Sequence, residues 1–325
     1  MARPPRFATG FTPVSGARST RASRVAKLKP RKPPLVIGSA GRYAKWFAPS
    51  GGAAEDTTMA GRMPIVGGNW KMNMDLASGV ELAEDIAAGC ADLIERCEVA
   101  LFPAFPYLQA VGKALGHRTV LLGAQDVYHA PNGAFTGEVS AEMLLDLNVP
   151  IVLTGHSERR HVIGEDDELI NAKTRSALAA GLRVILCIGE TMEQREAGRT
   201  EQVNIDQLTA GLREISADQM RQVVIAYEPV WAIGTGLTAT PDDAEAVHHV
   251  IRLTLGKLYD RSIAEETRIQ YGGSVKPQNA ADLIAKENID GFLVGGASLK
   301  ADDFLAIIRA VAEAEAPMHY EAREA

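Results

Sequence analysis

Cysteine is scarce in this chain, and long apolar runs are absent from it. Only Cys90, Cys97 and Cys187 occur among 325 residues, and their number and irregular spacing exclude a disulfide framework and a zinc-binding motif. Each cysteine stands among apolar neighbours, so we expect buried thiols in a reducing compartment. No run of eighteen apolar residues exists, and no membrane-spanning helix is therefore expected.

Acidic residues are nearly missing from the start of the chain. Residues 1–62 contain 12 Lys and Arg but only 2 Asp and Glu, a net charge of +10, whereas the remainder carries −17. The same segment has seven prolines and no apolar periodicity, so it cannot bury enough surface to fold. We expect a disordered basic extension over residues 1–62. The acidic remainder has no electrostatic footprint for nucleic acid.

Three explanations of this extension remain open. An organelle transit peptide fits its Arg- and Ser-rich, acid-poor composition. A nucleic-acid-binding arm is the second, although interleaved aromatic residues are missing. An over-extended reading frame is the third, because Met59 and Met63 stand just before the first predicted strand. A secretory signal is excluded because the segment has no apolar core region. We expect a cytoplasmic protein. If the extension is a transit peptide, the compartment is instead a plastid or a mitochondrion.

From Ile65 onward, short apolar runs alternate with longer amphipathic segments, which is typical of strands followed by helices. The eight predicted strands are Ile65–Trp70, Val99–Phe102, Val120–Ala124, Ile151–Thr154, Arg183–Ile188, Val223–Tyr227, Arg268–Tyr271 and Gly291–Val294.

The clearest predicted helices are Leu76–Ile94, Thr240–Leu258 and a final one over Asp302–Glu315. The second starts with Thr240 as N-cap and Pro241 at its first position. Eight strand–helix units in about 250 residues match a closed parallel (β/α)8 barrel. We expect that barrel as one domain over residues 63–315, with a short tail over residues 316–325. An open doubly wound sheet is the alternative, but its glycine-rich fingerprint after the first strand is missing.

The segment Val223 to Gly236 combines several chemical features. A buried strand ends at a carboxylate, Glu228, and Pro229 keeps that residue extended so that it leaves the sheet at its carboxyl end. That end is where α/β enzymes carry out their chemistry. An apolar stretch from Val230 to Ile233 follows, and Gly234 then supplies backbone that can approach a ligand closely. The segment predicts a base, a water-excluding flap and an anion site.

Polar residues also follow four other predicted strands. An amide and an ammonium come from the first, an imidazole after a glycine from the fourth, and glycine pairs, which suit phosphate, from the last two. These candidates are Asn69, Lys71, His156, Glu158, Ser274, Gly295 and Gly296. Taken alone, Lys71 is an ordinary solvated lysine, Asn69 a strand-end cap and His156 a surface or core histidine. His156 and His161 have the wrong spacing for a metalloprotease motif, so no metal site is predicted.

The combined motifs resemble the triosephosphate isomerase family. They are Gly-Asn-Trp-Lys-Met-Asn at 68–73, Gly-His-Ser-Glu-Arg-Arg-His at 155–161, Tyr-Gly-Gly-Ser-Val at 271–275 and the flap segment at 226–236. The resemblance covers about 248 residues and implies the interconversion of dihydroxyacetone phosphate and glyceraldehyde 3-phosphate without a cofactor.

By resemblance, each motif residue receives a role. Glu228 is the base, His156 the electrophile and Lys71 the cation, and Asn69 and Glu158 support them, with Asn69 and Lys71 also contacting the substrate. The expected phosphate-binding residues are Gly234, Ser274, Gly295 and Gly296. Two alternatives remain: another phosphosugar isomerase or lyase on a barrel, and a barrel recruited as a binding scaffold, which would need a broken site.

The resemblance further implies a homodimer. The loop from Gln125 to Val139, with Thr136 near its tip, would enter the neighbouring subunit, and Glu138 is a candidate partner for Arg159. An ordinary surface loop is the alternative. The chain departs from the family pattern at Thr154, where an apolar residue is expected, and in its basic extension and tail.

Overall fold

The computed structural model describes residues 62–116, 120–233 and 238–314, all within one compact unit that spans residues 58–325. The predictions for residues 1–61 and 315–325, and the phosphate-binding role of Gly234, lie outside the described residues. In the described part of the chain, no helix is long and apolar enough to cross a membrane.

The strands form one closed barrel in which each strand pairs in parallel with the next and β8 pairs with β1. Their bounds are β1 Ile65–Asn69, β2 Glu98–Phe102, β3 Leu121–Ala124, β4 Ile151–Thr154, β5 Arg183–Ile188, β6 Val223–Tyr227, β7 Ile269–Tyr271 and β8 Gly291–Val294. The predicted closed parallel barrel is confirmed, and each predicted strand occurs within one residue of its predicted ends.

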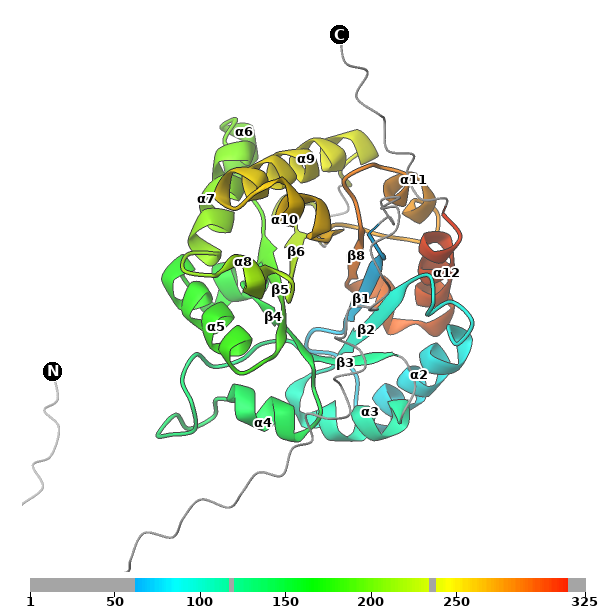
Figure 1. The fold of residues 1–325 in the computed structure, drawn as a ribbon. Helices are drawn as coiled ribbons and strands as arrows, with labels where there is room; N and C mark the ends of the chain where they lie inside the picture. The colour runs from blue at the N-terminus through cyan, green and yellow to red at the C-terminus, as the bar shows by residue number, and fades with distance from the viewer. Residues whose placement is uncertain (1–61, 117–119, 234–237, 315–325) are drawn as a thin grey trace, which may run out of the picture. The chain divides into compact units, whose positions relative to one another are not determined.

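Helices surround the strands on the outside of the barrel (Figure 1). They are α2 Leu76–Gly89, α3 Leu108–Leu115, α4 Ala141–Asp146, α5 Asp167–Ala179, α6 Met192–Glu196, α7 Thr200–Gly211, α8 Ala217–Met220, α9 Pro241–Leu258, α10 Arg261–Glu266, α11 Ala280–Ile284 and α12 Ala301–Ala312. Short helical turns follow four strands: η1 Phe105–Tyr107, η2 Arg159–Ile163, η3 Val230–Ala232 and η4 Gly296–Leu299.

Helix ends depend on local capping and on tertiary packing. Thr240 caps α9 as predicted, because its side chain accepts the backbone N–H of Asp243 and the side chain of Asp243 accepts that of Thr240. Helix α2 ends at Gly89, five residues before the predicted Ile94. A side chain at Gly89 would lie 2.4 Å from Leu305 of α12, so the two helices pack closely there.

Strand side chains alternate between two buried clusters. Ile65 and its equivalents fill the barrel interior, whereas Val66 and its equivalents pack against the surrounding helices. Both faces of the strands are therefore buried, which explains their continuous apolar runs. The three cysteines are free and buried as predicted, and burial raises the pKa of the Cys90 thiol to about 11.

Candidate active site

A cleft of about 560 Å³ opens at the carboxyl ends of the strands. Most of the predicted site residues that the structure describes line this cleft; Glu158 is the exception and stands just outside it. The lining includes Asn69, Lys71, His156, Glu228, Ser274, Gly295 and Gly296. The barrel therefore brings together side chains that are separated by more than 150 positions in the sequence.

Glu228 is the most constrained of these side chains. It follows β6, its backbone N–H donates to the carbonyl of Ile188 at 2.8 Å, and only 2% of the residue is exposed. One carboxylate oxygen, Oε2, accepts the backbone N–H of Ser157 at 2.9 Å. The other, Oε1, lies 3.1 Å from Nε2 of His156. A buried carboxylate thus faces the cleft from a fixed backbone, with two donors on its oxygens.

His156 follows β4 through a turn that requires glycine. Gly155 has φ +70°, and a side chain there would meet Ile170 at 2.9 Å and the carbonyl of Cys187 at 3.0 Å. The backbone N–H of Glu158 donates to Nδ1 of His156 at 3.2 Å. This contact assigns the ring proton to Nε2, so the imidazole is neutral and donates toward Glu228 and the cleft.

Lys71 adopts an unusual backbone conformation, with φ 52°. Such a conformation costs a non-glycine residue about 1 kcal/mol or more, and surrounding contacts must hold it. The Lys71 N–H donates to Oδ1 of Asn69 at 3.0 Å, and Gln125 donates to the Lys71 carbonyl at 2.7 Å. Its ammonium pairs with Oε1 of Glu158 at 2.7 Å. A side chain at Gly295 would lie 3.5 Å from Cε of Lys71, so the cation stands beside this glycine pair.

The buried carboxylate of Glu190 binds the start of the predicted flap through hydrogen bonds. Trp231 of η3 donates from Nε1 to Oε1 of Glu190 at 2.7 Å, and Tyr227 donates its hydroxyl to the same oxygen at 3.1 Å. The guanidinium of Arg195 lies over the indole ring of Trp231 at 4.3 Å. Glu190 itself has no exposed surface. The flap therefore begins at a defined anchor.

Arg159 has two closer partners besides the one expected. It pairs with Asp126 at 3.0 Å and with Glu165 at 2.6 Å, and the expected Glu138 adds an electrostatic attraction to the same guanidinium. Lys173, which is 2% exposed, forms ion pairs with both of these acids. Glu165 was not foreseen because it lies six residues beyond Arg159, past the η2 turn. Thr154, the residue that departs from the family pattern, shares a hydrogen bond with Thr174 of α5 at 2.9 Å.

Several other supporting residues were also missed. Gln125, Ser157 and Glu190 contact the site through hydrogen bonds that join distant strand ends. Gln125 carried a recognisable signal, since it directly follows β3 as Glu228 directly follows β6.

A closed parallel barrel with a buried carboxylate, a neutral imidazole and a lysine at the mouth defines an enzyme of the (β/α)8 class, equipped for acid–base chemistry on a small anionic molecule. A family model described as triosephosphate isomerase matches residues 64–311. The chain belongs to the triosephosphate isomerase family, as its motifs indicated.

Individual relatives are similar to this chain in sequence along the whole barrel. A triosephosphate isomerase of Chlorobium phaeobacteroides is 51% identical over 249 residues, which cover 77% of this chain and 99% of the relative. The enzyme of Chloroflexus aurantiacus is 51% identical over 247 residues, 76% of this chain and 98% of the relative. The enzyme of Herpetosiphon aurantiacus is 50% identical over 248 residues, which cover 76% of this chain and 99% of the relative.

Proposed function

We propose that this chain is an isomerase that interconverts dihydroxyacetone phosphate and D-glyceraldehyde 3-phosphate by proton transfer through an enediolate, in glycolysis and gluconeogenesis. Its membership of the triosephosphate isomerase family supports the substrate. The single observation that carries the chemistry is the 3.1 Å approach of His156 Nε2 to Glu228 Oε1 within one cleft that Lys71 also lines.

In this mechanism Glu228 is the general base. Its carboxylate removes a proton from the carbon next to the substrate carbonyl and returns it to the neighbouring carbon. For a substrate to fit between Glu228 and His156, the 3.1 Å contact between them must open, and the carboxylate must exchange that contact and its hydrogen bond from Ser157 for the substrate carbon. Burial of Glu228 favours this exchange, because few water molecules compete for the released carboxylate.

His156 and Lys71 stabilise the charge that then collects on the substrate oxygens. The Nε2–H of His156 donates to them and relays the proton that leaves the substrate hydroxyl to the former carbonyl oxygen, so that one carbon-bound and one oxygen-bound proton change places. The ammonium of Lys71 provides a positive charge in the same cleft. Asn69 supports Lys71 by accepting its backbone N–H, and Glu158 supports it through the ion pair. Asn69 and Lys71 also contact the substrate.

The phosphate is bound by backbone and hydroxyl groups at the glycine-rich strand ends. Ser274, Gly295 and Gly296 line the cleft, and the end of the Lys71 side chain lies beside Gly295. Gly296 leads into η4, and a side chain at that position would meet nothing within 4 Å, so the backbone there is open to a ligand. Gly234, outside the described residues, completes the proposed site. Backbone N–H groups at such turns suit phosphate.

The division of the chain into domains is also part of this proposal. The sequence predicts a barrel over residues 63–315, after a basic extension over residues 1–62 and before a tail over residues 316–325. Arg62 is described and contacts the barrel, so we assign it to the barrel side of this boundary. A cytoplasmic location suits a chain that starts near Met59, and an organelle suits a processed transit peptide.

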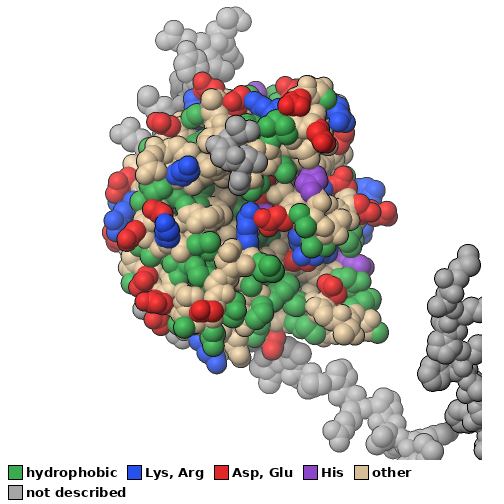
Figure 2. Space-filling view, turned by 180° about the vertical axis from the view of Figure 1, so that it is seen from behind, with side chains coloured by type: hydrophobic (Ala, Val, Ile, Leu, Met, Phe, Trp, Pro, Cys, Tyr) green, Lys and Arg blue, Asp and Glu red, His purple; other side chains and the backbone are tan. Residues whose placement is uncertain are grey.

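The assembly is a homodimer in this proposal. Hydrophobic side chains gather over the lower half of one molecular face (Figure 2). The exposed apolar residues include Met72, Val162 and Ile163, with 94%, 78% and 64% of their surface accessible. Large exposed apolar groups favour a protein interface. The loop from Gln125 to Val139, with Thr136 near its tip, would enter the partner subunit.

A coupled isomerase assay on the purified chain tests the activity, and Glu228→Gln tests the site. Loss of a general base lowers the rate about 100- to 10,000-fold. The variant should keep the thermal midpoint of the wild type within a few degrees, because glutamine can still accept the Ser157 N–H. An activity loss below about tenfold would refute the role of Glu228.

A further inference from the structure

A buried side-chain amide contacts the backbone next to the proposed base. Gln207 lies on α7 and is only 9% exposed. Its Oε1 accepts the backbone N–H of Gly189 at 2.8 Å, and its Nε2 donates to the Gly189 carbonyl at 3.2 Å. One side chain therefore satisfies both backbone groups of a single residue.

Gly189 lies where β5 and β6 continue to pair beyond their ends. Glu228 donates its N–H to the carbonyl of Ile188 at 2.8 Å, and Val230 donates to that of Glu190 at 3.1 Å. A side chain on Gly189 would lie 1.7 Å from the carbonyl oxygen of Glu228. The backbone of the base therefore rests directly on Gly189, and a shift of either segment displaces the other.

The other edge of Gly189 has no strand to pair with. Backbone groups of successive residues in a strand point to opposite edges, so those of Gly189 point away from β6 and toward β4. Strand β4 ends at Thr154, which pairs with Leu186, three residues before Gly189. The amide of Gln207 occupies the place of the missing strand. Without it, two buried backbone groups would lack partners.

We propose that Gln207 is a positioning residue for the isomerisation, which fixes the location of the base Glu228 through the backbone of Gly189. The inference rests on the proposed function. Gln207 does not line the cleft, so its effect on substrate binding is small. Its effect on proton transfer is large, because a displacement of about 1 Å in a reacting group can lower a rate about 100-fold.

The test is Gln207→Met, which keeps the length of the side chain and removes both hydrogen bonds. We expect kcat to fall at least about tenfold while KM changes less than about twofold. With a misplaced base, cleavage of the carbon–hydrogen bond becomes the slow step. A substrate deuterated at that carbon should therefore show a larger isotope effect on kcat than it does with the wild type.

Two matched glutamines serve as controls. Gln270 has no exposed surface and donates to the carbonyls of Ile65 and Phe292, so Gln270→Met removes a buried amide that does not contact Gly189. It should lower the thermal midpoint but leave the isotope effect near the wild-type value. Gln202 lies on the exposed side of α7 and pairs with Asp206; Gln202→Met should change neither quantity.

The outcomes separate the two proposals. If the wild type shows no isomerase activity, the proposed function fails. If the wild type is active and Gln207→Met retains its kcat and isotope effect, or if Gln270→Met raises the isotope effect equally, the positioning role is refuted. Should Gln207→Met not fold, Gln207→Glu replaces it. Glutamate keeps the acceptor for the Gly189 N–H but loses the donor, and an unchanged kcat in that variant also overturns the proposal.

Discussion

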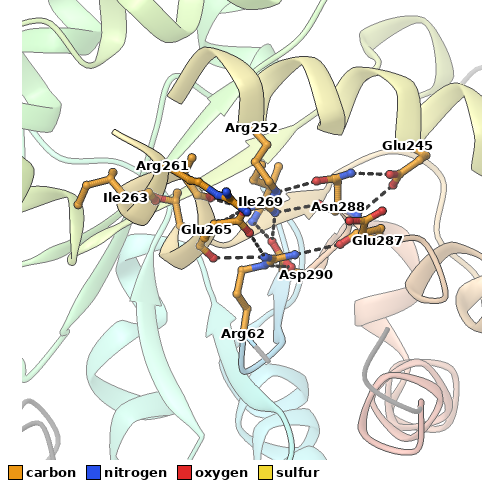
Figure 3. Close-up of polar contacts among 12 residues, drawn as sticks. Arg62, Glu245, Arg252, Arg261, Ile263, Glu265, Ile269, Glu287, Asn288 and Asp290 are labelled. Atoms are coloured by element: carbon orange, nitrogen blue, oxygen red, sulfur yellow. Dashed lines mark hydrogen bonds and ion pairs between the residues drawn. The ribbon is translucent and has the colours of Figure 1, made fainter. Parts of the chain in front are cut away.

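Arg62, the first residue that the structure describes, contacts the amino-terminal end of the barrel (Figure 3). Its Nε lies 2.6 Å from Oδ1 of Asp290, its Nη1 donates to the carbonyl of Glu265 at 3.2 Å, and its Nη2 donates to that of Glu287 at 2.9 Å. Only 10% of the side chain is exposed. We therefore predict that a chain starting at Met63 is less stable than one starting at Met59.

The size of the effect depends on what remains around Asp290. Removing one partner of a buried ion pair costs about 3–5 kcal/mol when the other charge is left alone. Here Asp290 keeps Arg252, whose Nη2 lies 2.7 Å from Oδ2, so the carboxylate stays paired. Removing Arg62 therefore costs only its few charge-assisted hydrogen bonds, which lowers the free energy of unfolding by about 2 kcal/mol. For a domain of this size the thermal midpoint should fall by about 4–8 °C.

Calorimetry of four chains tests this prediction: the full chain, residues 59–325, residues 63–325, and residues 59–325 carrying Arg62→Met. The first two should unfold at the same temperature, and the last two should unfold earlier by similar amounts. Arg261→Met is the matched control, because Arg261 also pairs with Glu265 but at 4.0 Å and with 90% of its side chain exposed. Equal midpoints for residues 59–325 and 63–325 would refute the reasoning.

Three further predictions concern the flap, the dimer and pH. Deleting Trp231 to Ile233 should expose the enediolate to water, and the amount of methylglyoxal and free phosphate per turnover should then rise; an unchanged ratio would mean that the flap does not protect the intermediate. Thr136→Arg should weaken the dimer in sedimentation and lower activity with it, because an unpaired charge would enter the receiving pocket; an unchanged dimer with full activity would contradict the loop assignment. Burial lowers the pKa of His248 to about 3. The unfolded state therefore binds more protons below about pH 6.5, and the contribution of His248 to stability decreases as the pH falls from there, by up to about 1.4 kcal/mol per pH unit. His248→Gln should show a smaller slope than the wild type in urea unfolding between pH 5 and 7, and equal slopes would contradict this assignment.

The sequence by itself determined the strand order and the location of the chemical groups. Apolar runs such as Val223–Tyr227 are recognisable because strands buried on both faces need continuous apolar side chains. The barrel then follows from the number of units, and it places every strand end at one mouth. Glu228 and His156 could therefore be selected from the chain, since each follows such a run.

Only the tertiary structure decided which residues hold these groups in place. Gln207 lies on a helix whose sequence shows almost no separation of polar and apolar faces, and nothing local distinguishes it from the exposed Gln202 on the same helix. Arg62 stood in a segment that looked unstructured by composition, yet its partners lie more than 200 residues away. A hydrogen bond depends on the relative placement of two segments to within a fraction of an ångström. That placement results from packing of the whole barrel, which residue type and spacing do not encode locally.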